Sequence, residues 1–162
     1  MASRLNSRGE TRRKLRYEEL ERREVLATLV VANANDSGDG SLRNAIVEAN
    51  GTTERDTITF DIGIGVQVIR PQTALPAITN PLTIDGTSQP GYSGIPLIEL
   101  DGAQAGDQVP GLTIDSSSVE IRGLSVSSFD GAGIHIVSGS NSTIAGNYVG
   151  LLGGNDRGIQ IE

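Results

Sequence analysis

The chain has 162 residues, of which 36% are hydrophobic, and it carries no cysteine and no tryptophan. Its length fits a single domain, and its composition excludes disulfides, thiolate metal sites and cysteine nucleophiles. The net charge of −7 is unevenly placed: residues 28–162 hold fifteen carboxylates and five arginines, an acidic balance that argues against nucleic acid as a partner.

Residues 1–27 form a charged segment with eight basic residues and five glutamates. We expect a tail outside the fold, a frayed helix or a disordered segment, because few apolar residues could anchor it. Residues 25–34 end in a small-x-small pattern that is typical of a signal-peptidase site, but the upstream glutamates favour a first strand at 28–32. No stretch approaches the roughly 18 apolar residues of a membrane span, so we predict none.

A turn and one amphipathic helix follow. Residues 33–40 are rich in Asn, Asp, Ser and Gly, which favour turns. Ser41 can cap a helix with apolar residues at 42, 45, 46 and 49, and Asn50-Gly51 is expected to end it in the left-handed conformation that both residues accept. Residues 28–56 are therefore predicted to be a strand and a helix that cap the open end of the fold.

From Asp56 onward the sequence predicts short strands whose apolar pattern returns every 22 to 25 residues in the last third of the chain. Leu112 recurs as Ile134 and Ile159, and Ile121 recurs as Ile144. Such a period is the signature of a solenoid. We predict an all-β fold, a right-handed parallel β-helix whose coils span 57–162. The expected strands are 57–60, 66–69, 82–84, 97–100, 111–114, 119–122, 134–137, 142–145 and 159–161.

Two stretches resemble the start of large bacterial cell-surface parallel β-helix proteins, which are adhesin-like. The first contains Ser-Leu-Arg-Asn-Ala-Ile within 33–50, and the second is Asp-Thr-Ile-Thr-Phe at 56–60 followed by Pro-Leu-Thr-Ile-Asp-Gly at 81–86. Those proteins carry a Ser-Leu-Arg-x-Ala-Ile helix that Cys often precedes, and Gly40 stands at that place here. Residues 15–27 resemble a segment thought to serve export. The resemblance implies a secreted or cell-surface protein with an adhesin-like role.

Glu99 and Asp101 are candidate ligand contacts on one coil. They are two residues apart on a predicted strand, so both carboxylates should project from the same outer face, on the order of 7 Å apart. That spacing is compatible with glycoside hydrolysis by a carboxylate pair, although two solvated charges are the simpler interpretation. No basic partner stands at a recognisable repeat position. The Gly-His-Gly and Arg-Ile-Lys signatures of β-helix polygalacturonases are absent, and we predict no catalytic residue.

Tyr92, in a loop at 88–94, and Tyr148, on a coil, are the aromatic side chains placed to stack on a sugar. His135 is the only histidine and should point outward; without a second His or Cys it makes no transition-metal site.

Calcium is the one cofactor that the sequence allows. Asp36 and Asp39 in the loop 35–39 are the best candidate ligands, although turn formation is the simpler reason for both residues. On an outer face, Arg122 should follow Glu120 as an isolated exposed ion pair, which contributes little to stability.

We therefore expect a non-enzymatic extracellular or cell-surface scaffold or adhesion-type module. The alternatives are a polysaccharide-acting lyase or hydrolase with a pectin-lyase-like fold and a carbohydrate-binding module, since a fold alone does not determine a function. A surface polysaccharide or a protein is the expected partner. We also expect end-to-end self-association through an uncapped C-terminal coil. The sequence leaves open whether more coils follow in a longer protein.

Overall fold

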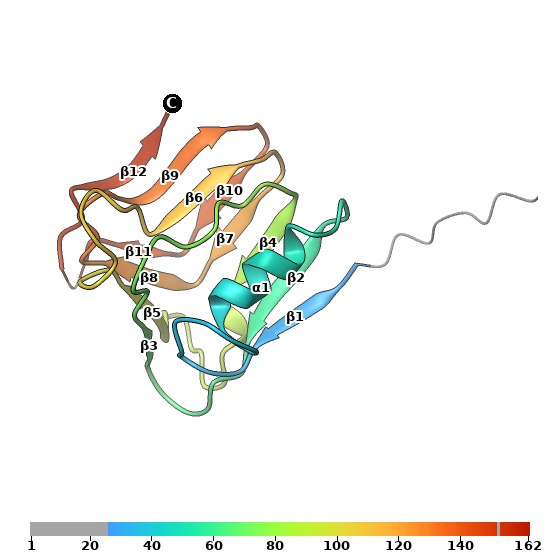
Figure 1. The fold of residues 1–162 in the computed structure, drawn as a ribbon. Helices are drawn as coiled ribbons and strands as arrows, with labels where there is room; N and C mark the ends of the chain where they lie inside the picture. Colours follow the sequence, from blue (N-terminus) through green and yellow to red (C-terminus); the bar gives the residue numbers. More distant parts are fainter. Residues whose placement is uncertain (1–25, 152) are drawn as a thin grey trace, which may run out of the picture.

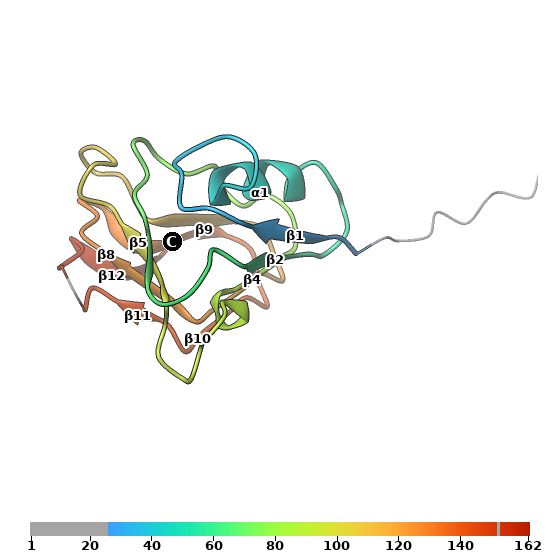
Figure 2. The same ribbon diagram turned by 90° about the horizontal axis from the view of Figure 1, so that it is seen from below.

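The computed structural model describes residues 26–151 and 153–162, which form a parallel β-solenoid of five coils with a single short α-helix (Figures 1 and 2). Every strand pairing is parallel, so the predicted β-helix is confirmed. Its right-handed sense stays a prediction. The predicted tail at 1–27 lies almost wholly outside the described residues.

Successive coils contribute strands to three parallel sheets. Sheet A contains β1 (Thr28–Val31), β2 (Asp56–Phe60), β4 (Leu82–Asp85), β7 (Glu120–Arg122) and β10 (Thr143–Ala145). Sheet B contains β3 (Gln67–Ile69), β5 (Ile98–Asp101), β8 (Leu124–Ser127) and β11 (Tyr148–Val149). Sheet C contains β6 (Leu112–Asp115), β9 (Ala132–Ser138) and β12 (Arg157–Ile161). The helix α1 (Leu42–Ala49) and the 3₁₀ turn η1 (Gly86–Ser88) complete the described elements.

The register of the strands confirms the sequence repeat residue by residue. Leu112 pairs with Ile134, and Ile134 pairs with Ile159 one coil later. Ile121 pairs with Ile144 in the same way. A repeat of 22 to 25 residues in the sequence is therefore one turn of the solenoid.

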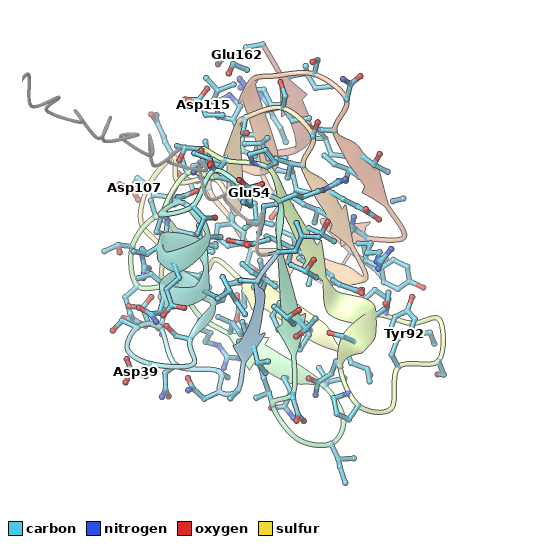
Figure 3. The ribbon with its side chains drawn as sticks, turned by 90° about the vertical axis from the view of Figure 1, so that its right-hand side faces the viewer. Asp39, Glu54, Tyr92, Asp107, Asp115 and Glu162 are labelled. Carbon is cyan, nitrogen blue, oxygen red and sulfur yellow. The ribbon has the colours of Figure 1, made fainter. Side chains whose placement is uncertain are left out.

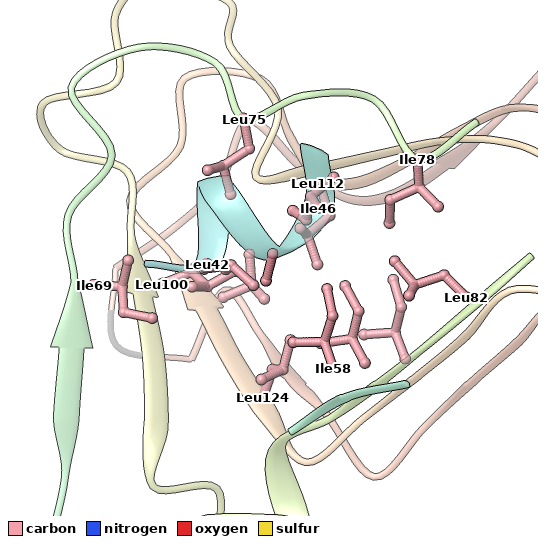
Figure 4. Packing of buried hydrophobic residues seen from close by; sticks show 14 of the residues in the cluster. Leu42, Ile46, Ile58, Ile69, Leu75, Ile78, Leu82, Leu100, Leu112 and Leu124 are labelled. Carbon is pink, nitrogen blue, oxygen red and sulfur yellow. The ribbon is translucent and has the colours of Figure 1, made fainter. Parts of the chain in front are cut away.

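The core is a column of aliphatic side chains from successive coils. In sheet A, Ile58, Ile84 and Ile121 are paired in register and fully buried. Figure 4 shows Leu42 and Ile46 of α1 directed into the same cluster. Burying a side chain of this size is worth about 1.5–3 kcal/mol, and each coil gains that burial only from its neighbours.

Helix α1 begins as predicted but ends for a different reason. The Ser41 side chain accepts a hydrogen bond from Asn44 N–H, so Ser41 is the N-cap. The expected left-handed end is wrong, since Asn50 has φ −68°. Its side chain instead donates to the Ala77 carbonyl at 2.7 Å and accepts from Thr79 N–H at 3.0 Å. The helix thus ends where a side chain ties it to the second coil.

Among the described helices, none combines the length and the apolar character that crossing a bilayer requires; α1 has only eight residues. Figure 1 shows α1 beside β1 and β2, at the first-coil end of the stack.

Two strands that the sequence did not predict as separate elements are β8 and β11. Each follows its preceding strand after a very short corner that holds a glycine in the left-handed region: Gly123 has φ 70° and Gly146 has φ 65°. A single left-handed residue redirects the chain from sheet A into sheet B, so an apolar run that looks continuous in the sequence is folded across two sheets.

Candidate ligand-binding groove

A polar groove of about 440 Å³ lies on the outer side of sheet C. Three successive coils line the groove. The third coil contributes Gln108 and Pro110, and the fourth contributes residues 130–132 and His135. The fifth coil contributes Asp156, Arg157 and Gln160. Its volume lies in the range of small-molecule sites, about 300–1,000 Å³. Side chains far apart in the sequence therefore converge on one hollow of ligand size.

The connection between β5 and β6 forms one wall of the groove, and the next coil holds this wall in place. Asp130 Oδ2 accepts a hydrogen bond from Gln108 N–H at 2.8 Å, and Gly131 N–H donates to the Val109 carbonyl at 3.1 Å. A Cβ on Gly131 would lie 2.8 Å from the Val109 carbonyl carbon, so the close approach requires glycine. Gln108 has φ 58°, a conformation that costs a non-glycine residue about 1–3 kcal/mol. The contacts from Asp130 and Gly131 hold this backbone in its place.

The opposite side of the groove is built from equivalent positions on paired strands. His135 on β9 pairs with Gln160 on β12, in register with the neighbouring pair of Ile134 and Ile159. His135 Nε2 lies 3.0 Å from Glu162 Oε1, and Gln160 Oε1 accepts a hydrogen bond from Arg157 Nη1 at 2.8 Å. The Gln160 oxygen is thereby occupied while its amide NH₂ group can donate to a ligand.

Asp156 adds a second carboxylate to the groove. Its backbone N–H donates to the carbonyls of Phe129 and Gly131, at 3.2 and 3.1 Å, which fixes the corner before β12. Its Oδ2 lies 3.8 Å from Arg157 Nε. The groove thus combines two carboxylates, a guanidinium, an imidazole and two amides, a set of hydrogen-bond donors and acceptors suited to a ligand with many hydroxyl groups.

Sequence reasoning missed this groove, although one signal was present. The repeat of Ile134 as Ile159 places His135 and Gln160 at equivalent positions of adjacent coils, but it does not show that these positions border a hollow. Asp130 belongs to an Asp-Gly pair, which is typical of a turn. The repeat does not show that the 102–111 connection folds back over the next corner, because this connection is longer than the 128–131 corner that holds it and has no counterpart of equal length.

The ligand contacts predicted at Glu99, Asp101 and Tyr148 lie on sheet B, outside this groove. Glu99 and Asp101 alternate with buried residues on β5 and project from one face, as predicted. Across β5, β8 and β11, the register places Glu99, Ser125 and Tyr148 in one row. Ser125 is only 5% exposed, and its Oγ has no hydrogen-bond partner among the described residues.

Both carboxylates of β5 already have protein partners. Asp101 Oδ2 accepts a hydrogen bond from Arg70 Nε at 3.0 Å, and Glu99 Oε1 accepts one from Ser127 Oγ at 3.4 Å. The expectation that no basic residue stands at a repeat position is therefore wrong, because Arg70 follows β3 directly and so reaches Asp101 on the next coil. Ligand binding at this row stays a prediction.

Tyr92 and the predicted calcium loop lie far from each other. Figure 3 shows Tyr92 and Asp39 on opposite sides of the molecule. The predicted sugar contacts Tyr92 and Tyr148 therefore belong to different elements, a loop and the strand β11.

The Asp36 carboxylate is engaged within the protein. Its Oδ1 accepts hydrogen bonds from Arg43 Nη2 at 2.8 Å and from Gln72 N–H at 3.0 Å. Burial raises the pKa of Asp36, but these two hydrogen bonds and the charge of Arg43 outweigh it, and the pKa is lowered overall. Calcium at Asp36 would lie beside the positive charge of the Arg43 guanidinium, which disfavours it; calcium binding at Asp36 and Asp39 stays a prediction. In the parts of the chain that the structure describes, no three His, Cys, Asp or Glu side chains form a metal-binding group.

The ion pair of Glu120 and Arg122 belongs to a larger network on sheet A. Arg122 Nη2 lies 2.8 Å from Asp85 Oδ2, and Arg122 Nη1 lies 3.0 Å from Glu120 Oε1. Arg55 Nη2 is 3.9 Å from the other Glu120 oxygen. The prediction of an isolated pair is wrong, because the pairing of β4 with β7 brings Asp85 opposite Arg122.

Comparison with known proteins adds no family to these observations: no family model matches the chain, and no curated protein is significantly similar to its sequence. The parallel β-solenoid is therefore established by the structure alone.

Proposed function

We propose that this chain is a non-enzymatic, extracellular or cell-surface module of the adhesion type that binds a surface carbohydrate in the groove of sheet C. The observation that carries the proposal is the groove itself, in which polar side chains from three coils face one hollow. Pro110, Gly131 and Ala132 are its only residues without a polar side chain. A ligand there is recognised by hydrogen bonds more than by apolar burial, which favours a polyhydroxylated molecule.

The scaffold part of the proposal rests on the stacking of coils. Continuous parallel ladders and an aliphatic column hold the backbone, so the groove residues are presented by strands and by a corner that those strands fix. Binding sites built on such elements hold their geometry better than sites on free loops. The proposed secretion and adhesin-like role rest on the resemblance of residues 33–60 to cell-surface β-helix proteins.

A carbohydrate array probed with the full chain tests this function. We expect binding to a surface polysaccharide in the wild type and a loss of most of the signal in Gln160→Ala, because the amide of Gln160 lies in the groove. Gln67→Ala is the matched control, since Gln67 lies on β3 of sheet B, does not line the groove, and donates its amide to the Ile64 carbonyl. Absence of any bound carbohydrate, or an equal loss in both variants, would contradict the proposal.

A polysaccharide-acting enzyme is the second candidate, and one specific observation favours it. Asp130, Asp156 and His135 share the groove, and carboxylates with an imidazole are the groups that general acid–base catalysis uses. Incubating the chain with each bound polysaccharide distinguishes the two functions. If the wild type releases new reducing ends or unsaturated products and Asp156→Asn does not, the chain is an enzyme and not a non-enzymatic adhesion module.

A further inference from the structure

The charges around the groove do not balance. Asp130 and Asp156 contribute two carboxylates and Arg157 one guanidinium. A third carboxylate, that of Glu162, lies 3.0 Å from His135. The groove and its immediate rim therefore hold three carboxylates against one guanidinium, an excess of negative charge.

The single guanidinium is already engaged by the protein. Arg157 Nη1 donates to Gln160 Oε1 at 2.8 Å, and Arg157 Nε lies 3.8 Å from Asp156 Oδ2. A ligand carboxylate that approached Arg157 would meet the Asp156 carboxylate beside it. Like charges placed together disfavour a partner by several kcal/mol when they are shielded from water, and by less when solvent separates them.

The wider surface has the same sign. Asp107 precedes Gln108 on the connection that forms the wall, and Figure 3 labels Asp107 and Glu162 among the exposed acidic side chains. Residues 28–162 hold fifteen carboxylates against five arginines. Of those arginines, Arg43, Arg70 and Arg122 have ion-pair partners away from the groove. The field at the groove is therefore negative, and it repels anions before they make contact.

The groups that remain for a ligand are hydrogen-bonding groups with little positive charge. The Gln160 amide can donate, the Asp130 and Asp156 oxygens can accept from hydroxyl groups, and Gln108 and His135 can do either. Hydroxyl groups satisfy such acceptors, whereas carboxylates, which accept only, do not.

We infer that the groove takes neutral glycan chains and rejects chains that carry carboxylates. The inference rests on the proposed function and names the class of carbohydrate within it. A protein that binds acidic polysaccharides would instead need unpaired arginine or lysine side chains in its groove.

Matched pairs of oligosaccharides test this selectivity. The probes are neutral gluco-, galacto- and manno-oligosaccharides, each compared by titration calorimetry with the same chain oxidised at C6 to the uronate. We expect at least one neutral chain to bind and its uronate partner to bind about tenfold more weakly at low salt. This difference in affinity between the neutral chain and its uronate should decrease as salt is added, because salt screens the groove carboxylates.

The double variant Asp130→Asn/Asp156→Asn removes the two charges while both side chains keep an accepting oxygen, including the one that holds Gln108 N–H. We expect the double variant to bind the uronate nearly as well as the neutral chain. The exposed control Asp39→Asn should keep the wild-type difference in affinity between the two chains. Should the uronate bind as tightly as its neutral partner in the wild type, the inference is overturned and the proposed function stands. If no chain of either class binds, both are overturned.

Discussion

At the scale of single residues, the stacking of coils decides which charged side chains meet. Asp85 and Arg122 are 37 positions apart in the sequence but lie opposite each other on β4 and β7, with 2.8 Å between Oδ2 and Nη2. The hydrogen bond from Arg122 is the main cause that lowers the pKa of Asp85; burial opposes it, and the Thr87 hydroxyl and N–H add to it. The same contact raises the pKa of Arg122.

This lowered pKa predicts how Asp85 contributes to stability as a function of pH. A carboxyl whose pKa is lower in the folded than in the unfolded state stabilises the fold above its ordinary value of 3.8. That stabilisation is lost as the pH falls through the lower, folded-state value. Asp85→Asn should therefore lower the free energy of unfolding at pH 7 by about 1 kcal/mol, with a smaller difference from wild type at pH 3.

Urea titrations of both proteins at the two pH values measure this effect. Asp39→Asn is the control, since Asp39 is exposed and only its backbone carbonyl is bonded to Asn33. A constant difference between wild type and Asp85→Asn from pH 7 to pH 3 would show that the charge of Asp85 is irrelevant to stability.

At the scale of elements, the corners between sheets A and B set how closely the coils approach. Gly123 and Gly146 are equivalent residues of the fourth and fifth coils, and both have a left-handed φ. Their surroundings differ: a Cβ on Gly123 would lie 2.7 Å from Thr87 N on the preceding coil, whereas a Cβ on Gly146 would meet nothing within 4 Å.

The two glycines therefore predict different costs for the same substitution. Gly146→Ala adds only the strain of a left-handed alanine, about 1–2 kcal/mol. Gly123→Ala adds a clash with the backbone of η1, and we expect a further loss of about 1–3 kcal/mol. Thermal and urea unfolding of both variants give the comparison, and equal destabilisation would mean that the coils separate at this corner without cost.

The elements also show what the sequence could and could not predict. Strands such as β2 and β6 were placed within a residue or two, because alternation and the spacing of equivalent isoleucines are local patterns. The repeat of Gly123 as Gly146 was visible in the sequence, but the spacing alone does not show that the glycine adopts a left-handed φ and begins a new strand. The partners of Asp101 and Arg122 were missed because each lies on a neighbouring coil.

At the scale of the whole molecule, the groove exists only because coils of unequal length are stacked. The 102–111 connection is longer than its counterpart at 128–131, and the shorter corner supports the longer one through Asp130 and Gly131. Periodicity predicts what the coils share, which is the core. The candidate site arises from what they do not share, so a repeat analysis cannot locate it.

The fifth coil carries the last prediction. Within the described residues, β10, β11 and β12 are the outermost strands of their sheets, and their outer edges pair with no strand. The buried column reaches the surface here: Leu112 and Ile134 are fully buried, whereas their equivalent Ile159 is 48% exposed and the neighbouring Ile161 is 71% exposed. Unpaired parallel edges with exposed aliphatic side chains pair readily with other strands.

We therefore expect the 162-residue chain to self-associate through this coil, with a sedimentation coefficient that rises with concentration. Ile161→Lys should shift the chain toward the monomer, because it places a charge at the edge. Ile64→Lys is the matched control, since Ile64 is 93% exposed but lies in the 61–66 connection. Further coils, where they follow in a longer chain, would cover the same surface. A monomer at every concentration would show that the exposed column is too small to drive association, and an equal effect of both lysines would place the contact elsewhere.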